Sequence, residues 1–419
     1  MLIIKWKNEL EWKIKVSGSK NATLPILWAS LLLRWKVKLK WVPKIWDVIT
    51  FLEILEWIWV KHKFEWDILD LDSTNINPDN LDFEKIRKIR SSIFLLSPLL
   101  HFFGNIHIPF PGGCSIWKRP IDAHLNWLEA IWYKSKFDWE NITIDWKLNW
   151  WTKIINAWFW VSSTENLIVA NVLRDGETII MWAATEPHVM NLIDFLRKAW
   201  ADIKIRYNHE IIVKWVYNLK NNFEFDIVWD YIESGTYMII AALASKEYLD
   251  IENARIDDLY MFIEKLKEAW VKVKDMWNDI LRVNKANKLK WVSFQTNIFP
   301  GFPTDLQSPF GVLMTQAEWI SKIHEVLFEW RLNFIIELEK MKANAAVLNP
   351  HEALIFGPSE LKWWVTVTSW DLRAWAAMVI AWLIAEWETQ IANVEYIHRG
   401  YENFVEKLRN IGAEIEEIN

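Results

Sequence analysis

Hydrophobic residues along the chain follow one repeating pattern. A short run rich in β-branched residues leads into a segment whose apolar residues recur at helical spacing, such as Ile193, Leu196 and Ala199. A new strand-like run then follows. Copies of this unit span 37–62, 178–205, 250–273 and 389–415, with a degraded copy at 332–347. The spacing between copies is irregular, which excludes a solenoid, so the pattern predicts an α/β protein built from similar subdomains.

The predicted helices end at positions where glycine would be the ordinary residue. In the last copy, Gly412 falls where a helix C-terminus needs the left-handed conformation. The equivalent positions in three other copies hold Trp59, Trp200 and Trp270. A large aromatic side chain is a poor choice there. The repeats therefore indicate that some of the tryptophans occupy glycine positions.

Length and charge exclude several classes of protein. A chain of 419 residues favours two domains, and a net charge of −6 argues against a nucleic-acid binder. No apolar run approaches the roughly 18 residues of a membrane span, and the first residues lack the features of a signal peptide. The single cysteine excludes an internal disulfide and suits the cytoplasm. No Cys/His cluster has metal-binding spacing, so we expect neither a metal nor a cofactor.

The single cysteine lies in an unusual loop, Pro111-Gly-Gly-Cys-Ser-Ile-Trp-Lys-Arg-Pro120. Two glycines precede Cys114, so the backbone can turn sharply there. Lys118 and Arg119 follow within five residues, and nearby cations favour a reactive thiolate. A lone cysteine is often only a small buried hydrophobe. The glycines and the cations together favour a working thiol.

The same loop partly matches a phosphate-binding P-loop. If Trp117 were glycine, residues 112–118 would read G-x-x-x-x-G-K. The next position should be Ser or Thr to hold magnesium, but it is Arg119, followed by Pro120. The pattern is therefore compatible with an anion-binding loop and not with a magnesium-nucleotide site.

Further motifs resemble those of the enolpyruvyl transferases, in particular the members that act on UDP-N-acetylglucosamine. The resemblance runs from about residue 3 to 415, in order and at family spacing. Besides the cysteine loop with Asp122 and His124, the motifs are Ser17-Gly-Ser-Lys20-Asn21, Arg87-Lys-Ile-Arg90, Ser163-Thr-Glu-Asn166, Glu186-Pro187, Pro300-Gly-Phe-Pro-Thr-Asp305-Leu-Gln307, Asp371-Leu-Arg373 and His398-Arg-Gly-Tyr-Glu402.

The resemblance implies an α/β fold of two domains, each with three β-α repeats around a pseudo-threefold axis, an inside-out α/β barrel. One domain would span 20–228 and carry the cysteine loop. The other would be discontinuous, formed by 1–19 and 229–419. The family places its active site in the cleft between the domains, where the nucleotide sugar promotes closure of the cysteine loop.

The implied reaction transfers enolpyruvate from phosphoenolpyruvate to the 3′-hydroxyl of UDP-N-acetylglucosamine, the first committed step of peptidoglycan synthesis. These two small molecules are the expected partners. By family match, the catalytic residues are Cys114 as general acid, Asp305 beside the sugar hydroxyl, and the cations Lys20 and Arg399. Residues matched to substrate binding, or to closure and support of the site, are Lys20, Asn21, Arg90, Arg119, Pro120, Ile121, Asp122, Ala123, His124, Val161, Ser162, Asp305, Leu327, Arg331, Asp371 and Arg373.

The chain departs from the family at several positions. Trp158 and Trp160 replace a lysine and a serine in the loop before Ser163, Thr185 stands where arginine precedes Glu186, and Tyr231 replaces an arginine. Two alternatives remain: the shikimate-phosphate enolpyruvyl transferase, which lacks the Pro-Gly-Gly-Cys loop, and a catalytically silent paralogue that binds a nucleotide sugar. The cysteine loop argues against the first, and the retained Cys114, Asp305, Lys20 and Arg399 argue against the second.

The amino-acid composition, like the repeats, indicates that tryptophan stands at positions where glycine is expected. The chain has 33 Trp and only 11 Gly, about 2.6% glycine against a usual value near 7%. The family has glycine opposite Trp117, Trp375, Trp382 and Trp387. We therefore expect most of the tryptophans to be glycine in the natural protein. A code in which UGA means glycine, translated as tryptophan, would produce this pattern.

Overall fold

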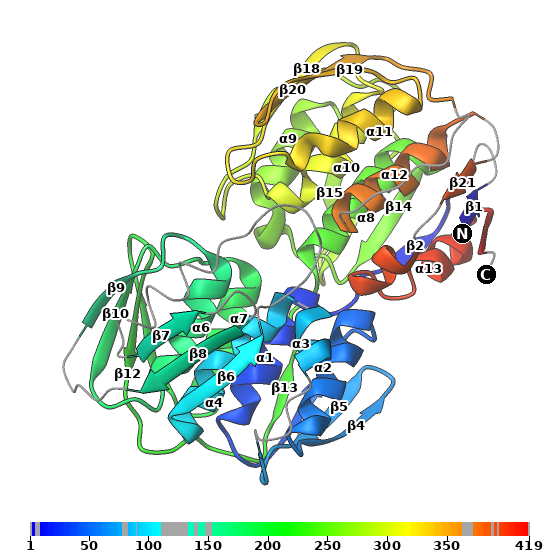
Figure 1. Ribbon diagram of the computed structural model, residues 1–419. Coiled ribbons are helices and arrows are strands. Elements are labelled where there is room, and N and C mark those ends of the chain that lie inside the picture. Colours follow the sequence, from blue (N-terminus) through cyan, green and yellow to red (C-terminus); the bar gives the residue numbers. More distant parts are fainter. Residues whose placement is uncertain are drawn as a thin grey trace. The chain divides into compact units, whose positions relative to one another are not determined.

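The computed structural model describes residues 2–4, 9–77, 83–88, 90–109, 133–137, 141–146, 153–362, 372–386, 389–391 and 394–417. Contacts between residues separate two compact units (Figure 1). One runs from Gly18 to Val228. The other joins the residues up to Ser17 with those from Trp229 onward. The chain therefore begins in one unit, builds the other and returns.

The described part of the Gly18–Val228 unit contains three sheets. The first has the strand order β13(Glu224–Asp226)-β3(Lys36–Lys40)-β5(Ile68–Asp72)-β4(Lys61–Glu65). The second has the order β11(Asp202–Arg206)-β12(Glu210–Lys214)-β10(Glu177–Met181)-β9(Lys153–Asn156). The third has the order β6(Asn105–Pro109)-β8(Asn141–Trp146)-β7(Tyr133–Phe137).

Helices pack with these sheets, and their apolar residues contribute to the core of the unit. The helices are α1 (Lys20–Leu31), α2 (Trp46–Trp57), α3 (Phe83–Lys88), η2 (Arg90–Leu95), α4 (Leu96–Phe103), α6 (Val161–Asn171) and α7 (Pro187–Lys198). Helix α1 is buried from Ala22 to Leu31, on every side, and it packs against α2, α4 and α7. A helix that is apolar all round belongs in a core, so α1 is a central element of the unit.

The other unit also has three sheets among its described residues. Two follow the orders β15(Val273–Asp275)-β16(Ile280–Asn284)-β14(Tyr248–Glu252)-β2(Lys13–Lys15) and β17(Phe294–Gln295)-β18(Trp319–His324)-β20(Glu352–Gly357)-β19(Asn344–Asn349). The third, β21(Thr389–Ile391)-β1(Leu2–Ile4)-β22(Ile415–Glu417), pairs the two ends of the chain.

Three buried helices form the interior of this second unit. Helices α8 (Tyr231–Ala244), α10 (Gln307–Met314) and α12 (Leu372–Ile384) pack on one another and are buried over almost their whole length (Figure 1). The remaining helical segments are η3 (Ile256–Leu259), α9 (Tyr260–Glu268), η4 (Thr304–Leu306), η5 (Arg331–Asn333), α11 (Phe334–Lys340), η6 (Val394–Arg399) and α13 (Phe404–Asn410). Each unit has its own hydrophobic core.

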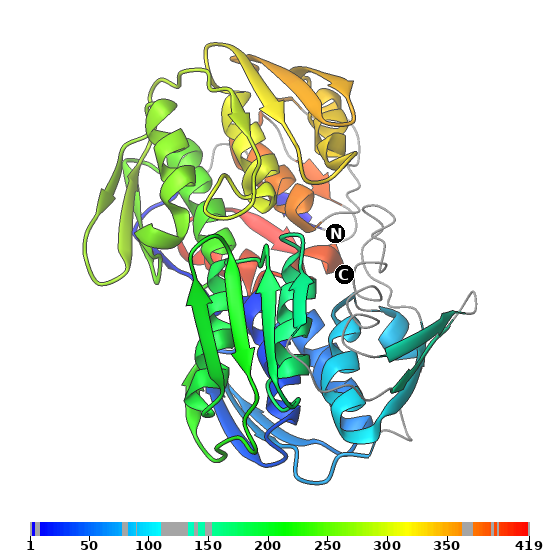
Figure 2. The same cartoon turned by 90° about the vertical axis from the view of Figure 1, so that its left-hand side faces the viewer.

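The structure confirms the α/β class and the sequence repeat. Four sheets have the same pattern of strand pairing. In each, one edge strand pairs in parallel with its neighbour, and the other two pairings are antiparallel. The four full copies of the repeat each form a strand, a helix and a strand. The degraded copy at 332–347 contains α11 and most of β19, and the strand before it, β18, lies outside the predicted bounds. The predicted core residues Ile193, Leu196 and Ala199 are fully buried. Within the described ranges the sheets remain separate and do not close into a barrel (Figure 2).

Five helices end in the same hydrogen-bonded turn. The first residue beyond the C-cap has positive φ, and its N–H donates to the carbonyl three residues back at 2.9–3.0 Å. The next N–H donates to the carbonyl five residues back at 2.9–3.0 Å. This is the Schellman arrangement, which glycine favours. The left-handed residues after α2, α7, α9, α11 and α13 are Trp59, Trp200, Trp270, Lys342 and Gly412.

A search of the described residues for membrane-crossing helices finds none with the required length and apolar character.

Candidate active site

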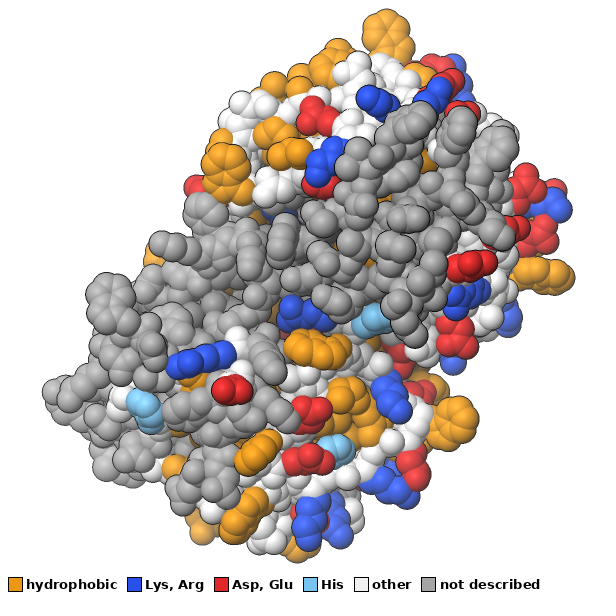
Figure 3. Space-filling model, turned by 45° about the vertical axis from the view of Figure 1, so that its right-hand side comes forward, with side chains coloured by type: hydrophobic (Ala, Val, Ile, Leu, Met, Phe, Trp, Pro, Cys, Tyr) orange, Lys and Arg blue, Asp and Glu red, His pale blue; other side chains and the backbone are white. Residues whose placement is uncertain are grey.

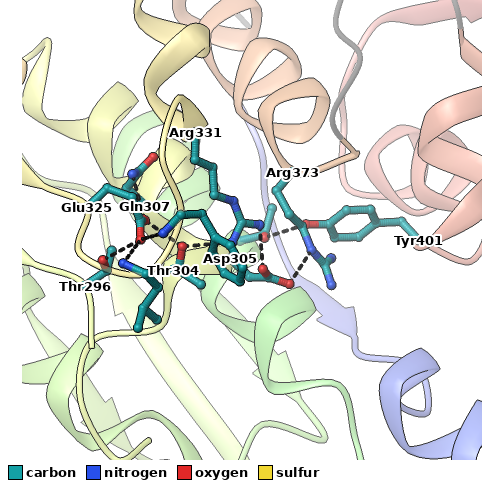
Figure 4. A network of polar contacts seen from close by, with 11 residues as sticks. Thr296, Thr304, Asp305, Gln307, Glu325, Arg331, Arg373 and Tyr401 are labelled. Carbon is teal, nitrogen blue, oxygen red and sulfur yellow. Dashed lines mark hydrogen bonds and ion pairs between the residues drawn. The ribbon is translucent and has the colours of Figure 1, made fainter. Parts of the chain in front are cut away.

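Asp305 lies at the centre of a buried polar network (Figure 4). It belongs to η4, which follows Pro303 and leads directly into α10. The Nη2 atom of Arg331 donates to Oδ1 of Asp305 at 2.6 Å, and Nε of Arg373 donates to Oδ2 at 3.1 Å. Both arginines are buried. Two cations from distant parts of the chain therefore hold one partly buried carboxylate.

The two arginines determine the charge of Asp305. Burial alone would raise the pKa of this carboxyl, but the positive charges of Arg331 and Arg373 outweigh burial and hold its pKa well below the usual range. Burial likewise disfavours the charge of Arg373, yet Tyr401, Asp305 and Asp230 together raise the pKa of Arg373. In this arrangement Asp305 is a stable anion and a weak proton acceptor.

Glu325 organises the other side of the network. Its carboxylate accepts hydrogen bonds from Thr304 Oγ1 at 2.6 Å and from the backbone N–H groups of Leu327 and Phe328 at 2.8 and 3.1 Å. Thr296 and Gln307 donate to it as well. Thr304 Oγ1 also accepts from Nη1 of Arg331 at 2.8 Å. Glu325 therefore links the turn that carries Leu327 to the arginine beside Asp305.

Sequence reasoning did not identify Glu325. It is a single carboxylate directly after strand β18, and no local motif distinguishes it from an exposed glutamate. Its role follows only from the three-dimensional meeting of β18 with η4 and α10. Tyr401 belongs to the motif that spans 398–402, but the sequence assigned it no role. Its ring lies 5.1 Å from the guanidinium of Arg373, and its hydroxyl contacts Thr236 at 2.9 Å.

Lys20 is the first residue of α1 and forms a buried ion pair. Its Nζ lies 2.5 Å from Oδ2 of Asp47, at the beginning of α2. Ser19 caps α1, because its Oγ accepts from the N–H of Ala22 at 3.3 Å. Gly18 is needed before it, since a Cβ there would lie 1.6 Å from the carbonyl oxygen of Trp41. Asn21 follows Lys20 and is half-buried.

Val161 and Ser162 begin helix α6 and are half-buried. The preceding turn contains Trp158, with a positive φ, and the N-cap residue Trp160, which makes no side-chain cap. The indole of Trp158 lies 4.6 Å, centroid to centroid, from that of Trp182. Large aromatic groups therefore stand at the start of α6, where the resemblance predicts nucleotide-sugar contacts.

Two buried glutamates in the family motifs carry unusual pKa values. Burial, reinforced by the charge of Glu186, raises the pKa of Glu165 well above its usual range. Burial raises the pKa of Glu186 to about 7. Glu165 lies in α6 and Glu186 caps α7, and Thr185 replaces the arginine expected between them. Thr185, where the sequence departs from the family, therefore lies beside two glutamates whose raised pKa values favour the neutral form.

The remaining predicted residues are only partly described. Arg399 ends η6 and is half-buried, and Leu327 is positioned by Glu325. Arg90 begins η2, but its side chain is not described. Cys114, Arg119, Pro120, Ile121, Asp122, Ala123, His124 and Asp371 lie outside the described residues. The structure thus brings Asp305, Arg331 and Arg373 together, with Leu327 linked to them through Glu325. The assigned roles stay predictions.

Comparisons with known proteins decide the family. A family model described as EPSP synthase (3-phosphoshikimate 1-carboxyvinyltransferase) matches residues 4–408. A UDP-N-acetylglucosamine 1-carboxyvinyltransferase of Halothermothrix orenii is 39% identical over 416 residues, covering 99% of both chains. The chain belongs to the enolpyruvyl transferase family. A second protein of this name, from Carboxydothermus hydrogenoformans, is 37% identical over 418 residues, covering 100% of this chain and 99% of that protein.

Solved structures of enolpyruvyl transferases share the fold. The enolpyruvyl transferase NikO from Streptomyces tendae superposes with a TM-score of 0.90 at 21% identity, covering 99% of this chain and 98% of that chain. An EPSP synthase from Acinetobacter baumannii gives a TM-score of 0.74 at 15% identity, covering 100% and 99%. This protein therefore shares the fold of both of these transferases, and the fold alone does not identify the acceptor substrate.

Proposed function

We propose that this enzyme transfers the enolpyruvyl group of phosphoenolpyruvate to the 3′-hydroxyl of UDP-N-acetylglucosamine and releases phosphate. The observation that carries the proposal is the full-length similarity, 34–39% identical, to curated proteins of that name. The step would be the first committed one of peptidoglycan synthesis, in the cytoplasm, and would serve cell-wall formation, cell shape and division.

The proposed reaction has two stages. In the addition, the 3′-oxygen bonds to C2 of phosphoenolpyruvate, its proton goes to a base, and the methylene carbon C3 gains a proton. In the elimination, C3 loses a proton, the double bond re-forms and phosphate leaves. Cys114, matched by resemblance, would supply the proton to C3. Lys20 and Arg399 would bind the phosphate and carboxylate of phosphoenolpyruvate, since arginine and lysine suit such anions.

The arginine pair around Asp305 supports a substrate-dependent role for this carboxylate. While both arginines hold it, its low pKa makes it a poor base. An anionic substrate that draws one arginine away would raise the pKa of Asp305, because its stabilising charge is reduced. Asp305 would then accept the proton of the sugar hydroxyl only when the substrates are bound. The ion pair of Lys20 with Asp47 would open in the same way toward the phosphate.

An assay of phosphate release with two acceptors tests the proposal. Protein supplied with phosphoenolpyruvate and UDP-N-acetylglucosamine should release phosphate at a rate that saturates with both substrates. Shikimate 3-phosphate in place of the nucleotide sugar should give none. Asp305→Asn should slow release at saturation, and Asp226→Asn, which alters an exposed carboxylate of β13, serves as the matched control.

Two results would reject the proposed reaction, and a third would change only the role of Asp305. Release with shikimate 3-phosphate alone would move the enzyme to the other branch of its family. Binding of UDP-N-acetylglucosamine without any turnover would identify a silent paralogue. Full activity of Asp305→Asn would leave the reaction in place and remove Asp305 from it.

A further inference from the structure

Tryptophan occupies backbone conformations that bulky residues avoid. Among the 22 tryptophans in the described ranges, half have φ between +51° and +80°: Trp12, Trp41, Trp59, Trp66, Trp158, Trp182, Trp200, Trp270, Trp277, Trp319 and Trp330. In this left-handed region the Cβ atom crowds the following carbonyl oxygen, so glycine is the residue that enters it freely. Tryptophan, which has the largest side chain, is therefore frequent in a backbone conformation that large residues ordinarily avoid.

The helix ends provide an internal comparison. Helices α2, α7, α9 and α13 end in the same Schellman turn, with the same two hydrogen bonds. The left-handed position holds Gly412 after α13 and tryptophan after the other three, at Trp59, Trp200 and Trp270. Counting α11 as well, the same backbone geometry carries glycine in one copy of the repeat, lysine in one (Lys342) and tryptophan in three.

Hairpin turns show the same substitution. Trp66 has a φ of +56° in the two-residue turn between β4 and β5. Trp277 has a φ of +67° in the turn between β15 and β16. Tight turns that need a positive φ are ordinarily made with glycine, asparagine or aspartate. Both tryptophans therefore stand where those small residues are expected.

The other non-glycine residues in the left-handed region include three bulky ones of different types, Arg34, Phe159 and Lys342. Most of the non-tryptophan examples are Asn, Asp or His, the types that tolerate this conformation: Asn208, His209, Asn222, Asn253, Asn278, Asp279 and Asn403. The backbone is therefore not generally distorted, and tryptophan alone departs from expectation as a class. The anomaly belongs to this one residue type.

Burial and exposure of the tryptophans agree with the backbone. Trp28 is inside the core on α1, and its indole N–H is buried there without a hydrogen-bond partner. Others are mostly exposed, including Trp12, Trp66, Trp277 and Trp319. Among the coloured side chains on the face shown in Figure 3, hydrophobic groups lie interspersed with charged ones. The left-handed tryptophans Trp12, Trp66, Trp277 and Trp319 are thus largely exposed and contribute little to the core.

We propose that in its natural host this protein carries glycine at most positions printed as tryptophan, because the host reads as glycine a codon that has been translated here as tryptophan. UGA is the codon that fits, since it is a stop codon in the standard code and tryptophan in some variant codes. The low glycine content, 11 residues against 33 tryptophans, has the same explanation. The inference concerns the chain itself and holds whatever its activity.

Peptide mass spectrometry of the protein purified from its natural source tests this proposal directly. Trypsin releases Trp200 in the peptide 199–204 and Trp270 in the peptide 268–272. Both peptides should be lighter by the difference between tryptophan and glycine. The peptide that begins at Asn410 and contains Gly412 is the internal control and should keep its printed mass. Printed masses for the 199–204 and 268–272 peptides would overturn the proposal.

A recombinant comparison provides a second test that does not need the natural host. One protein has the printed sequence, and the other has glycine at the eleven left-handed tryptophan positions. The glycine version should give a larger soluble yield and a higher unfolding temperature. Equal or lower stability of the glycine version would contradict the conformational argument.

Discussion

Replacing Trp59 with glycine in recombinant protein of the printed sequence should stabilise the protein. Trp59 has a φ of +67°, directly after helix α2. A non-glycine residue held left-handed costs about 1–2 kcal/mol. The indole is 55% exposed and so contributes little burial. The greater freedom of glycine in the unfolded chain offsets part of the gain, which leaves about 1 kcal/mol of net stabilisation.

The matched control lies two residues away. Trp57 ends the same helix and is 50% exposed, but its φ is not in the left-handed region. Trp57→Gly should therefore destabilise the protein by up to about 1 kcal/mol, the usual cost of glycine in a helix. Thermal or urea unfolding measures both variants. A gain of 1 kcal/mol corresponds to about 2–4 °C in a unit of this size.

The two substitutions are expected to change the free energy of unfolding in opposite directions. If Trp59→Gly lowers the unfolding temperature as much as Trp57→Gly does, the left-handed conformation is not the source of the strain. If the signs differ as expected, eleven such sites cost on the order of 10 kcal/mol or more together. That amount is comparable with the whole stability of a domain, about 5–15 kcal/mol.

Further predictions concern the site and its surroundings. Cys114→Ala should lower turnover about 10²–10⁴-fold while UDP-N-acetylglucosamine still binds, and near-normal phosphate release would exclude the thiol as general acid. Asp305→Asn should lower kcat with little change in KM, whereas lost sugar affinity at full kcat would make Asp305 a binding residue. Burial raises the pKa of Glu186 from 4.5 to about 7, so the unfolded chain loses this proton first and stability falls by about 3 kcal/mol as pH rises from about 4.5 to 7. In urea unfolding Glu186→Gln should reduce the pH slope, to which the buried Glu165 also contributes, and an unchanged slope would show that Glu186 is not one of its sources. Replacing Trp158 and Trp160 together with glycine should tighten binding of UDP-N-acetylglucosamine in calorimetry, and an unchanged Kd would separate these indoles from the sugar site.

The repeats of the fold could be read from the sequence because their signal is local. Apolar spacing within about 25 residues predicted four strand-helix-strand units and, at 332–347, a degraded copy that corresponds to α11 and β19. The equivalence of Trp59, Trp200 and Trp270 with Gly412 was also local, since each follows its helix at the same offset, and the backbone confirms it.

The candidate site depends on contacts between distant residues. Asp305 meets partners at residues 331 and 373, and no spacing rule connects them. The family resemblance named these residues but did not indicate that the arginines would hold the carboxylate itself. Glu325 and the pairing of Lys20 with Asp47 were missed for the same reason. Polar networks of this kind follow from tertiary packing, which hydrophobic periodicity does not encode.

The most direct test of the proposed activity is identification of the product. Enzyme incubated with phosphoenolpyruvate and UDP-N-acetylglucosamine should yield phosphate and the 3′-O-enolpyruvyl nucleotide sugar in equal amounts, measured by NMR and mass spectrometry of the same reaction. Saturable binding of UDP-N-acetylglucosamine first shows that the protein is intact. If such protein leaves the nucleotide sugar unchanged after long incubation, the result contradicts the proposed activity.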